Sequence, residues 1–132
     1  MINTLISAYK KKIEINSFYL SGVLYPLINN GHDNFIEDRS ATPEEKSYVN
    51  PVRISTVKKP IKKTKADSTP YGYEDVFIMV SDNETIIVER LEFNYQNNRL
   101  KIIKRDPKIK YGTIFGYEYE LSDITSEAVY GT

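Results

Sequence analysis

Alternation of apolar and polar residues dominates the second half of the chain and predicts β-strands. DVFIMVS (75–81) is apolar on both of its alternating faces, which is typical of a strand buried on both sides. LEFNYQNNRLKIIKR (91–105) alternates, crosses the polar cluster at 96–98 and alternates again, which predicts a hairpin that turns on its asparagines. FGYEYEL (115–121) predicts a further strand with an aromatic inner face.

The first half of the chain is less regular. Helical spacing of apolar residues predicts an N-terminal helix of two or three turns, with an apolar stripe of Ile2, Leu5, Ile6, Tyr9 and Ile13. Thr42 is a capping residue followed by a proline and two glutamates, a combination that predicts a short helical turn. Residues 57–70 hold five lysines and two prolines and predict a long exposed loop. Residues 106–113, interrupted by proline and glycine, predict another loop.

These elements predict a mainly β fold: a small β-barrel or sandwich of six to seven short strands, with a short N-terminal helix and a long basic loop. The length of 132 residues is that of one domain, so we expect a single barrel-like domain over 1–132 with an extended loop at about 57–70. The N-terminus lacks the charge order of a secretory signal, and no apolar run reaches membrane-spanning length. We therefore expect a protein made in a cytoplasm, with no membrane partner.

Residues suited to catalysis or metal binding are sparse. The absence of cysteine excludes disulfides, thiolate catalysis and cysteine-bound zinc. The one histidine, His32, lies beside Asp33 in the turn-like sequence NGHDN, where neighbouring side chains usually point apart, so we interpret it as an exposed turn residue. No phosphate-binding glycine loop or serine nucleophile motif is present. We expect a protein that is not an enzyme and that has no cofactor and no metal site.

The charges sum to zero, with 18 basic and 18 acidic residues, but they are segregated along the chain. One basic block consists of Lys58, Lys59, Lys62, Lys63 and Lys65, and a second consists of Arg99, Lys101, Lys104, Arg105, Lys108 and Lys110. Such blocks can serve contacts between complementary subunits or attract a phosphate backbone, and they can equally be solvated surface. A lysine-rich segment with almost no apolar residues has no evident role in folding, which favours an interaction.

Tyrosine is the prominent aromatic residue, with eleven tyrosines and no tryptophan in the chain. Tyr71 and Tyr73 come directly after the first basic block. Tyrosine is favoured at protein interfaces, where its ring packs and its hydroxyl stays hydrated, and it is also common at the periphery of a core. Both interpretations fit the sequence.

The order of segments along the chain resembles a known family. An N-terminal apolar segment, MINTLISAYKKKIEI, is followed by GVLYP, an extended VNPV, a variable loop, the strand DVFIMVSD, the hairpin LEFNYQNNRLKIIKRD and a closing aromatic strand, YGTIFGYEYEL. This order is similar to that of the small head-closure proteins of tailed bacteriophage necks, also described as stopper, head-tail connector or head completion proteins. The hairpin departs from the family pattern because it lacks the turn glycine and has Leu100 where an aromatic residue is common.

The resemblance implies a structural virion protein that forms a homo-oligomeric ring of six or twelve copies between the portal or adaptor ring and the tail proteins, and that helps to close the DNA channel. By this analogy the 57–70 loop faces the channel, and its five lysines lie close to the phosphates of packaged DNA, a contact without sequence specificity. A ring interface would accommodate the segregated charges. Candidate interface residues are Tyr71, Tyr73, Arg99, Lys101, Lys104 and Arg105.

A second hypothesis is a small barrel that binds single-stranded nucleic acid through a basic, aromatic face. Lys101, Lys104, Tyr95 and Tyr117 around the 91–105 hairpin favour this hypothesis, whereas the alternation of the last strand directs its aromatics to the core. An enzyme would require an arrangement of acid, base and nucleophile that these residues do not supply.

Overall fold

The computed structural model describes residues 2–62 and 70–126 of the chain, with the side chains of 59–74 left undescribed. The fold is mainly β, as the sequence predicts. One helix precedes the strands: α1 (Ile2–Glu14), β1 (Ser21–Leu24), β2 (Leu27–Asn29), β3 (Phe35–Glu37), β4 (Glu44–Ser47), β5 (Arg53–Lys62), β6 (Pro70–Asp82), β7 (Glu92–Tyr95), β8 (Asn98–Lys110) and β9 (Thr113–Asp123).

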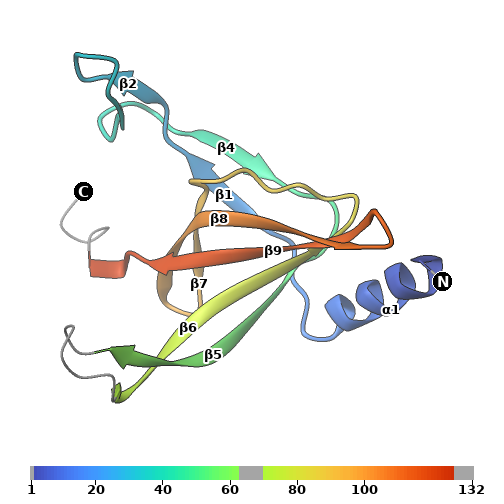
Figure 1. Cartoon of the computed structure of the whole chain (residues 1–132). Coiled ribbons are helices and arrows are strands. Elements are labelled where there is room, and N and C mark those ends of the chain that lie inside the picture. The colour runs from blue at the N-terminus through green and yellow to red at the C-terminus, as the bar shows by residue number, and fades with distance from the viewer. Residues whose placement is uncertain (1, 63–69, 127–132) are drawn as a thin grey trace.

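Seven strands form one antiparallel sheet in the order β4-β1-β7-β8-β9-β6-β5, and β2 and β3 form a separate two-stranded sheet. The large sheet is strongly curved, and β2 with β3 extends away from it (Figure 1). A single bridge between Phe18 and Val52 joins the segments that lead into β1 and β5. Two strands that are distant in the sheet order therefore begin close together.

The core lies on the face of the sheet that the alternation of apolar residues predicts. Leu91 and Phe93 are buried together, and in β9 the aromatic residues Tyr117 and Tyr119 are buried with Leu121. In β6 the prediction of burial on both sides is too strong, because Met79 is buried whereas its apolar neighbours along the strand are only half-buried. The second face of β6 is covered in part by α1, which contacts β6 and β9.

Helix α1 confirms the predicted N-terminal helix and packs on β9 through Tyr9. The Tyr9 ring meets Phe115 edge-on, with ring centroids 5.2 Å apart, and its hydroxyl donates to the carbonyl of Tyr117 at 3.3 Å. This approach requires the glycine at position 116, since a Cβ there would lie 2.1 Å from Cε1 of Tyr9. The helix ends at Glu14, and Asn16 follows with a positive φ of 58°, a conformation that asparagine tolerates at helix C-termini.

The prediction of a loop over 57–70 is partly wrong. Residues 57–62 belong to β5 and position 70 belongs to β6, and the two strands pair as Lys62↔Pro70. Residues 63–69 lie outside the described residues. Strand β5 is at the edge of the sheet, where lysine and proline are tolerated since one side of the backbone has no strand to pair with. The basic block therefore lies largely on a hairpin.

Two further local predictions are wrong for a similar reason. The helical turn predicted from Thr42 is replaced by β4, whose pairing with β1 outweighs a local capping signal. The loop predicted at 106–113 is shortened to a turn, because β8 continues through Pro107 to Lys110 and pairs with β9 as far as Lys110↔Thr113, with one shift of register between Lys108 and Ile109. At Pro107 the only described strand that pairs with β8 is β9, so the other side of the backbone can accommodate a proline. The described strands number nine, and several are longer than predicted.

Candidate functional site

A projecting hairpin, residues 25–38, is the most distinctive surface feature of the structure, and we call it the arm. Its two strands pair as Leu27↔Glu37, Ile28↔Ile36 and Asn29↔Phe35. The tip is closed by hydrogen bonds: the amide of Asn30 donates to the carbonyl of Asn34 at 2.6 Å, and the amide of Asn34 donates to the carbonyl of Gly31 at 3.1 Å. The arm extends from the large sheet at the top left of Figure 1. It therefore presents an ordered hairpin away from the core.

The arm carries large apolar side chains that the chain itself leaves accessible. Leu27, Ile28, Phe35 and Ile36 have between 42% and 59% of their surface exposed. A two-stranded hairpin alone is marginally stable in water, and apolar residues gain stability when another surface covers them. A cluster of exposed apolar residues on a projecting element is typical of a protein interaction site.

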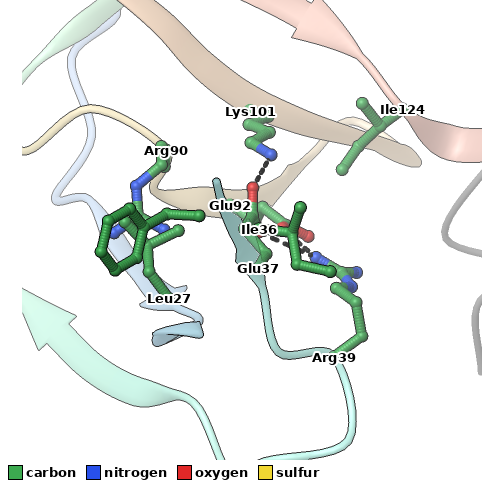
Figure 2. A pocket seen from close by; sticks show the side chains of 9 residues that line it. Leu27, Ile36, Glu37, Arg39, Arg90, Glu92, Lys101 and Ile124 are labelled. Atoms are coloured by element: carbon green, nitrogen blue, oxygen red, sulfur yellow. Dashed lines mark hydrogen bonds and ion pairs between the residues drawn. The ribbon is translucent and has the colours of Figure 1, made fainter. Parts of the chain in front are cut away.

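A cleft of about 460 Å³ separates the arm from the large sheet. Its walls are both apolar and charged: Leu27, Phe35, Ile36, Glu37, Arg39, Arg90, Glu92, Lys101 and Ile124 line it. Figure 2 shows four charged side chains directed toward one another across the cleft: Glu37 and Arg39 from the end of the arm and the residue after it, and Glu92 and Lys101 from β7 and β8. The cleft is therefore bridged by polar contacts.

These contacts form a chain of alternating charges that fastens the arm to the large sheet. Arg39 donates a hydrogen bond to Glu92 and lies 3.5 Å from an oxygen of Glu37. Lys101 pairs with Glu37, and Nε of Arg99 lies 3.5 Å from Oε1 of Glu92. We call this chain, Arg99–Glu92–Arg39–Glu37–Lys101, the latch. It links strands β3, β7 and β8, so the arm is held by charge pairs rather than by the apolar core.

Glu92 is the most deeply buried residue of the latch. Its side chain is 0% exposed, although the alternation of β7 suggests an outward position. Its oxygen Oε1 is buried and accepts no hydrogen bond within the described residues. A buried carboxylate is tolerated only when cations lie close to it, which makes Arg39 and Arg99 structurally important.

The base of the arm is held through Tyr25. The guanidinium of Arg39 lies 4.0 Å from the centroid of the Tyr25 ring, a cation–π contact. Arg90 donates to the carbonyl of Tyr25 at 3.0 Å, and the amide of Asp38 donates to the carbonyl of Pro26 at 2.8 Å. The hydrogen bond to Glu92 raises the pKa of Arg39 above its ordinary value, so the guanidinium of Arg39 stays charged across the physiological range.

The second basic block predicted from the sequence is largely paired within the chain. Arg99 and Lys101 belong to the latch, and Lys104 and Lys108 pair with Asp106 at 3.7 Å and with Glu118 at 3.3 Å. Arg105 donates to the carbonyl of Ile87 at 3.4 Å. The candidate interface residues on β8 are thus spread over two regions, the arm cleft and the exposed part of the β8–β9 hairpin.

The first basic block lies apart from the latch, on β5 and beyond its end. Lys58 is exposed and pairs with Asp75 on β6 at 3.0 Å. Lys59 and Lys62 lie on β5, and Tyr71 and Tyr73 lie on β6, but their side chains are outside the described set. Lys63 and Lys65 lie outside the described residues. Lys58 is therefore the one predicted channel residue whose side-chain position is known.

A buried polar cluster elsewhere serves the fold. The hydroxyl of Tyr119 accepts from the amide of Ile87 at 3.1 Å and lies 2.9 Å from Oγ of Ser81. Burial raises the pKa of Tyr119 above its usual value. His32 is exposed at the tip of the arm, as predicted for a turn residue. Among residues 2–62 and 70–126, no group of three or more acidic or histidine side chains is arranged to hold a metal ion.

The sequence around NNGHDN is hairpin-like, but sequence reasoning missed the projection of the arm from the sheet and missed the latch. The arm has a detectable signal, two short apolar segments around the turn sequence NNGHDN, but nothing local indicates that the segments stay uncovered. Within the described part of the chain no helix is long and apolar enough to cross a membrane. No protein-family model matches the sequence, and no curated protein matches it.

Proposed function

We propose that this protein is a structural component of a tailed-bacteriophage neck, a head-closure protein that forms a ring between portal and tail and helps to close the DNA channel. The proposal combines the order of segments along the chain with one structural observation. That observation is the arm, an ordered projecting hairpin with four large, accessible apolar side chains. Such a surface is suited to binding protein rather than to catalysis.

The barrel architecture is part of this proposal. The curvature of the seven-stranded sheet and the Phe18–Val52 bridge favour a small barrel that is incompletely closed between β5 and β1. A barrel of this kind would be a rigid scaffold from which hairpins reach neighbouring subunits and adjacent rings.

The β5–β6 hairpin is the proposed channel-facing element, in place of the predicted loop. Lys58, Lys59, Lys62, Lys63 and Lys65 belong to this hairpin and to the segment beyond β5. Lysines there would attract DNA phosphates without reading bases. The proposed partners are further copies of the chain in a ring of six or twelve, the portal or adaptor ring and the tail proteins, and the proposed location is the virion.

The alternative, a barrel that binds single-stranded nucleic acid, draws less support from the charges. Lys101 and Lys104 are each paired with a carboxylate, so binding of phosphates would have to break those contacts. Tyr117 is buried in the core, where it cannot stack on a base.

Two measurements test the proposal: the mass of the assembly that the purified chain forms, and the position of the protein in phage particles. Native mass measurement and negative-stain electron microscopy at low and moderate salt should find a ring of the chain, alone or assembled on its neighbours. Labelling with an antibody should place the protein at the neck of tailed particles. A chain that is absent from particles and binds short single strands tightly as a monomer would overturn the proposal and favour the alternative.

A further inference from the structure

A groove of about 810 Å³ lies along the outer edge of β5. Its lining comes from the segment before β1, the start of β5, the end of β7 and the β7–β8 turn: Asn16, Ser17, Phe18, Arg53, Ile54, Ser55, Thr56, Asn94, Tyr95 and Gln96. Arg53 is the only charged residue in this set. The groove therefore combines apolar and polar groups with one positive charge.

No described strand lies beside the edge of β5 in this groove. Among the described residues, β5 pairs with β6 on one side, and the Phe18–Val52 bridge ends just before Arg53. The backbone of 53–56 therefore presents unpaired amide and carbonyl groups to the groove. The far half of β5 carries lysines and Pro60, which discourage strand addition, whereas 53–56 (RIST) have neither.

The arm has matching free edges. Strands β2 and β3 pair with each other, and within the described part of the chain neither has a second strand neighbour. A free edge is a template for strand addition, in which backbone hydrogen bonds provide affinity and side chains provide specificity. The tip hydrogen bonds preorganise the arm, which lowers the entropic cost of binding.

We propose that the arm of one copy of this chain binds in the β5-edge groove of a second copy and extends its sheet. The inference deepens the proposed function, because it rests on assembly of the chain into a ring and names the surfaces that join neighbours. The lengths match: an arm strand of three residues spans about 10 Å and the open edge of four residues about 13 Å. The charges also match, since Asp33 is the one acidic residue between Leu27 and Ile36 and would lie near Arg53.

The positions of the two surfaces determine the symmetry of the contact. The arm projects from one corner of the sheet, whereas β5 begins beside the C-terminal end of α1, where Arg53 donates to the carbonyl of Lys12 at 3.0 Å (Figure 1). Because arm and groove are different surfaces, a single arm–groove contact between two copies is head-to-tail, whereas two reciprocal contacts would produce a two-fold pair of chains. Head-to-tail contacts produce a closed ring when the rotation between neighbours closes.

The test uses three variants of the full chain. The arm variant, Ile28→Glu with Phe35→Glu, places charges on accessible arm positions. The groove variant, Thr56→Glu with Arg53→Glu, alters the β5 edge, and Thr56→Glu alone serves as a milder form that keeps the contact of Arg53 with α1. A matched control, Ile86→Glu with Tyr111→Glu, makes the same kind of change at residues that are 52% and 65% exposed outside both surfaces. Circular dichroism and urea unfolding establish that each variant folds.

Native mass spectrometry and analytical ultracentrifugation then compare the masses. We expect wild type and control to form the same higher-order species, and the arm and groove variants to fall to the 15.3 kDa of one chain. An equimolar mixture of the two variants should form pairs of chains and nothing larger, because each pair contains one intact arm and one intact groove.

Other outcomes separate this inference from the proposed function. A wild-type ring that persists in a folded arm variant overturns arm binding and leaves the ring intact. A wild-type pair of chains that both variants dissociate supports arm binding and speaks against a ring. A wild-type chain that stays monomeric at millimolar concentration, or binds through its arm only to a different protein, overturns binding between copies.

Discussion

Replacement of Arg39 by methionine should destabilise the protein because it removes the central cation of the latch. Arg39 hydrogen-bonds Glu92, whose side chain is 0% exposed. Methionine keeps most of the length of the side chain but leaves the buried carboxylate with Arg99 alone, at 3.5 Å. The arm also loses its charge contact with Glu37 and its stacking on Tyr25.

The expected loss in the free energy of unfolding lies between two limits. Removal of one partner from a fully buried ion pair costs about 3–5 kcal/mol, whereas an exposed pair contributes about 0–1 kcal/mol. Glu92 is fully buried, but the side chain of Arg39 is 39% exposed and Arg99 remains as a second cation. We therefore expect a loss of about 2 kcal/mol in the free energy of unfolding. For a domain of this size, the melting temperature should fall by roughly 6–8 °C.

Urea unfolding at neutral pH measures the loss, with Lys46→Met as the control. Lys46 pairs with Glu44 at 3.2 Å on the surface, so its replacement should change stability by less than about 0.5 kcal/mol. The double variant Arg39→Met with Glu92→Met removes both charges and should recover about 1 kcal/mol relative to Arg39→Met. Hydrogen exchange should show faster exchange of the Asp38 amide in the single variant. If Arg39→Met costs no more than Lys46→Met, the latch does not hold the arm and the reasoning is wrong.

Three further predictions concern the core and the helix. Gly116→Ala should lower the free energy of unfolding in urea by about 1–3 kcal/mol, because the new Cβ overlaps the ring of Tyr9. Adding Tyr9→Ala to the same chain should remove most of that clash. A Gly116→Ala variant as stable as the wild type would contradict the packing of α1. Tyr119→Phe should cost about 1–3 kcal/mol, since it leaves the buried amide of Ile87 without its acceptor, and an unchanged melting temperature would argue against the buried cluster. Burial raises the pKa of Tyr9 to about 12, so the protonated hydroxyl contributes its full stability below about pH 10, and that contribution is lost as the pH rises through 12. The free energy of unfolding of Tyr9→Phe should therefore decline less steeply at alkaline pH than that of the wild type. Parallel curves of unfolding free energy against pH would refute the assignment.

The fold class could be predicted from the sequence because its signals are local and periodic. Strands β7, β8 and β9 form where the alternation predicts them, and the buried residues Phe93, Tyr119 and Leu121 lie on the inner face, although Glu92 in β7 is buried against the alternation. Helix α1 likewise has the predicted spacing of its apolar residues. These elements are determined by side chains that alternate or recur with the period of the structure they form.

The errors arise where pairing partners outweigh local composition. The lysines and Pro60 suggest a loop, yet β5 continues to Lys62 because an edge strand needs hydrogen bonds on one side only. Pairing with β1 likewise makes a strand of β4 where the sequence suggests a helical turn. Whether such a segment becomes a strand depends on the strand that it pairs with in the folded protein, and that partner can be distant in the sequence.

By itself the sequence determined a mainly β protein with one amphipathic helix, an aromatic core strand and segregated charges. Only the tertiary structure decided what those charges do: Glu92 and Lys101, opposite each other in the β7–β8 ladder, reach Arg39 and Glu37 from a distant hairpin and hold the arm. It also decided that the apolar residues of the arm stay accessible. The physical reason is that burial and ion pairing are properties of surfaces brought together by folding, whereas periodicity is a property of the chain.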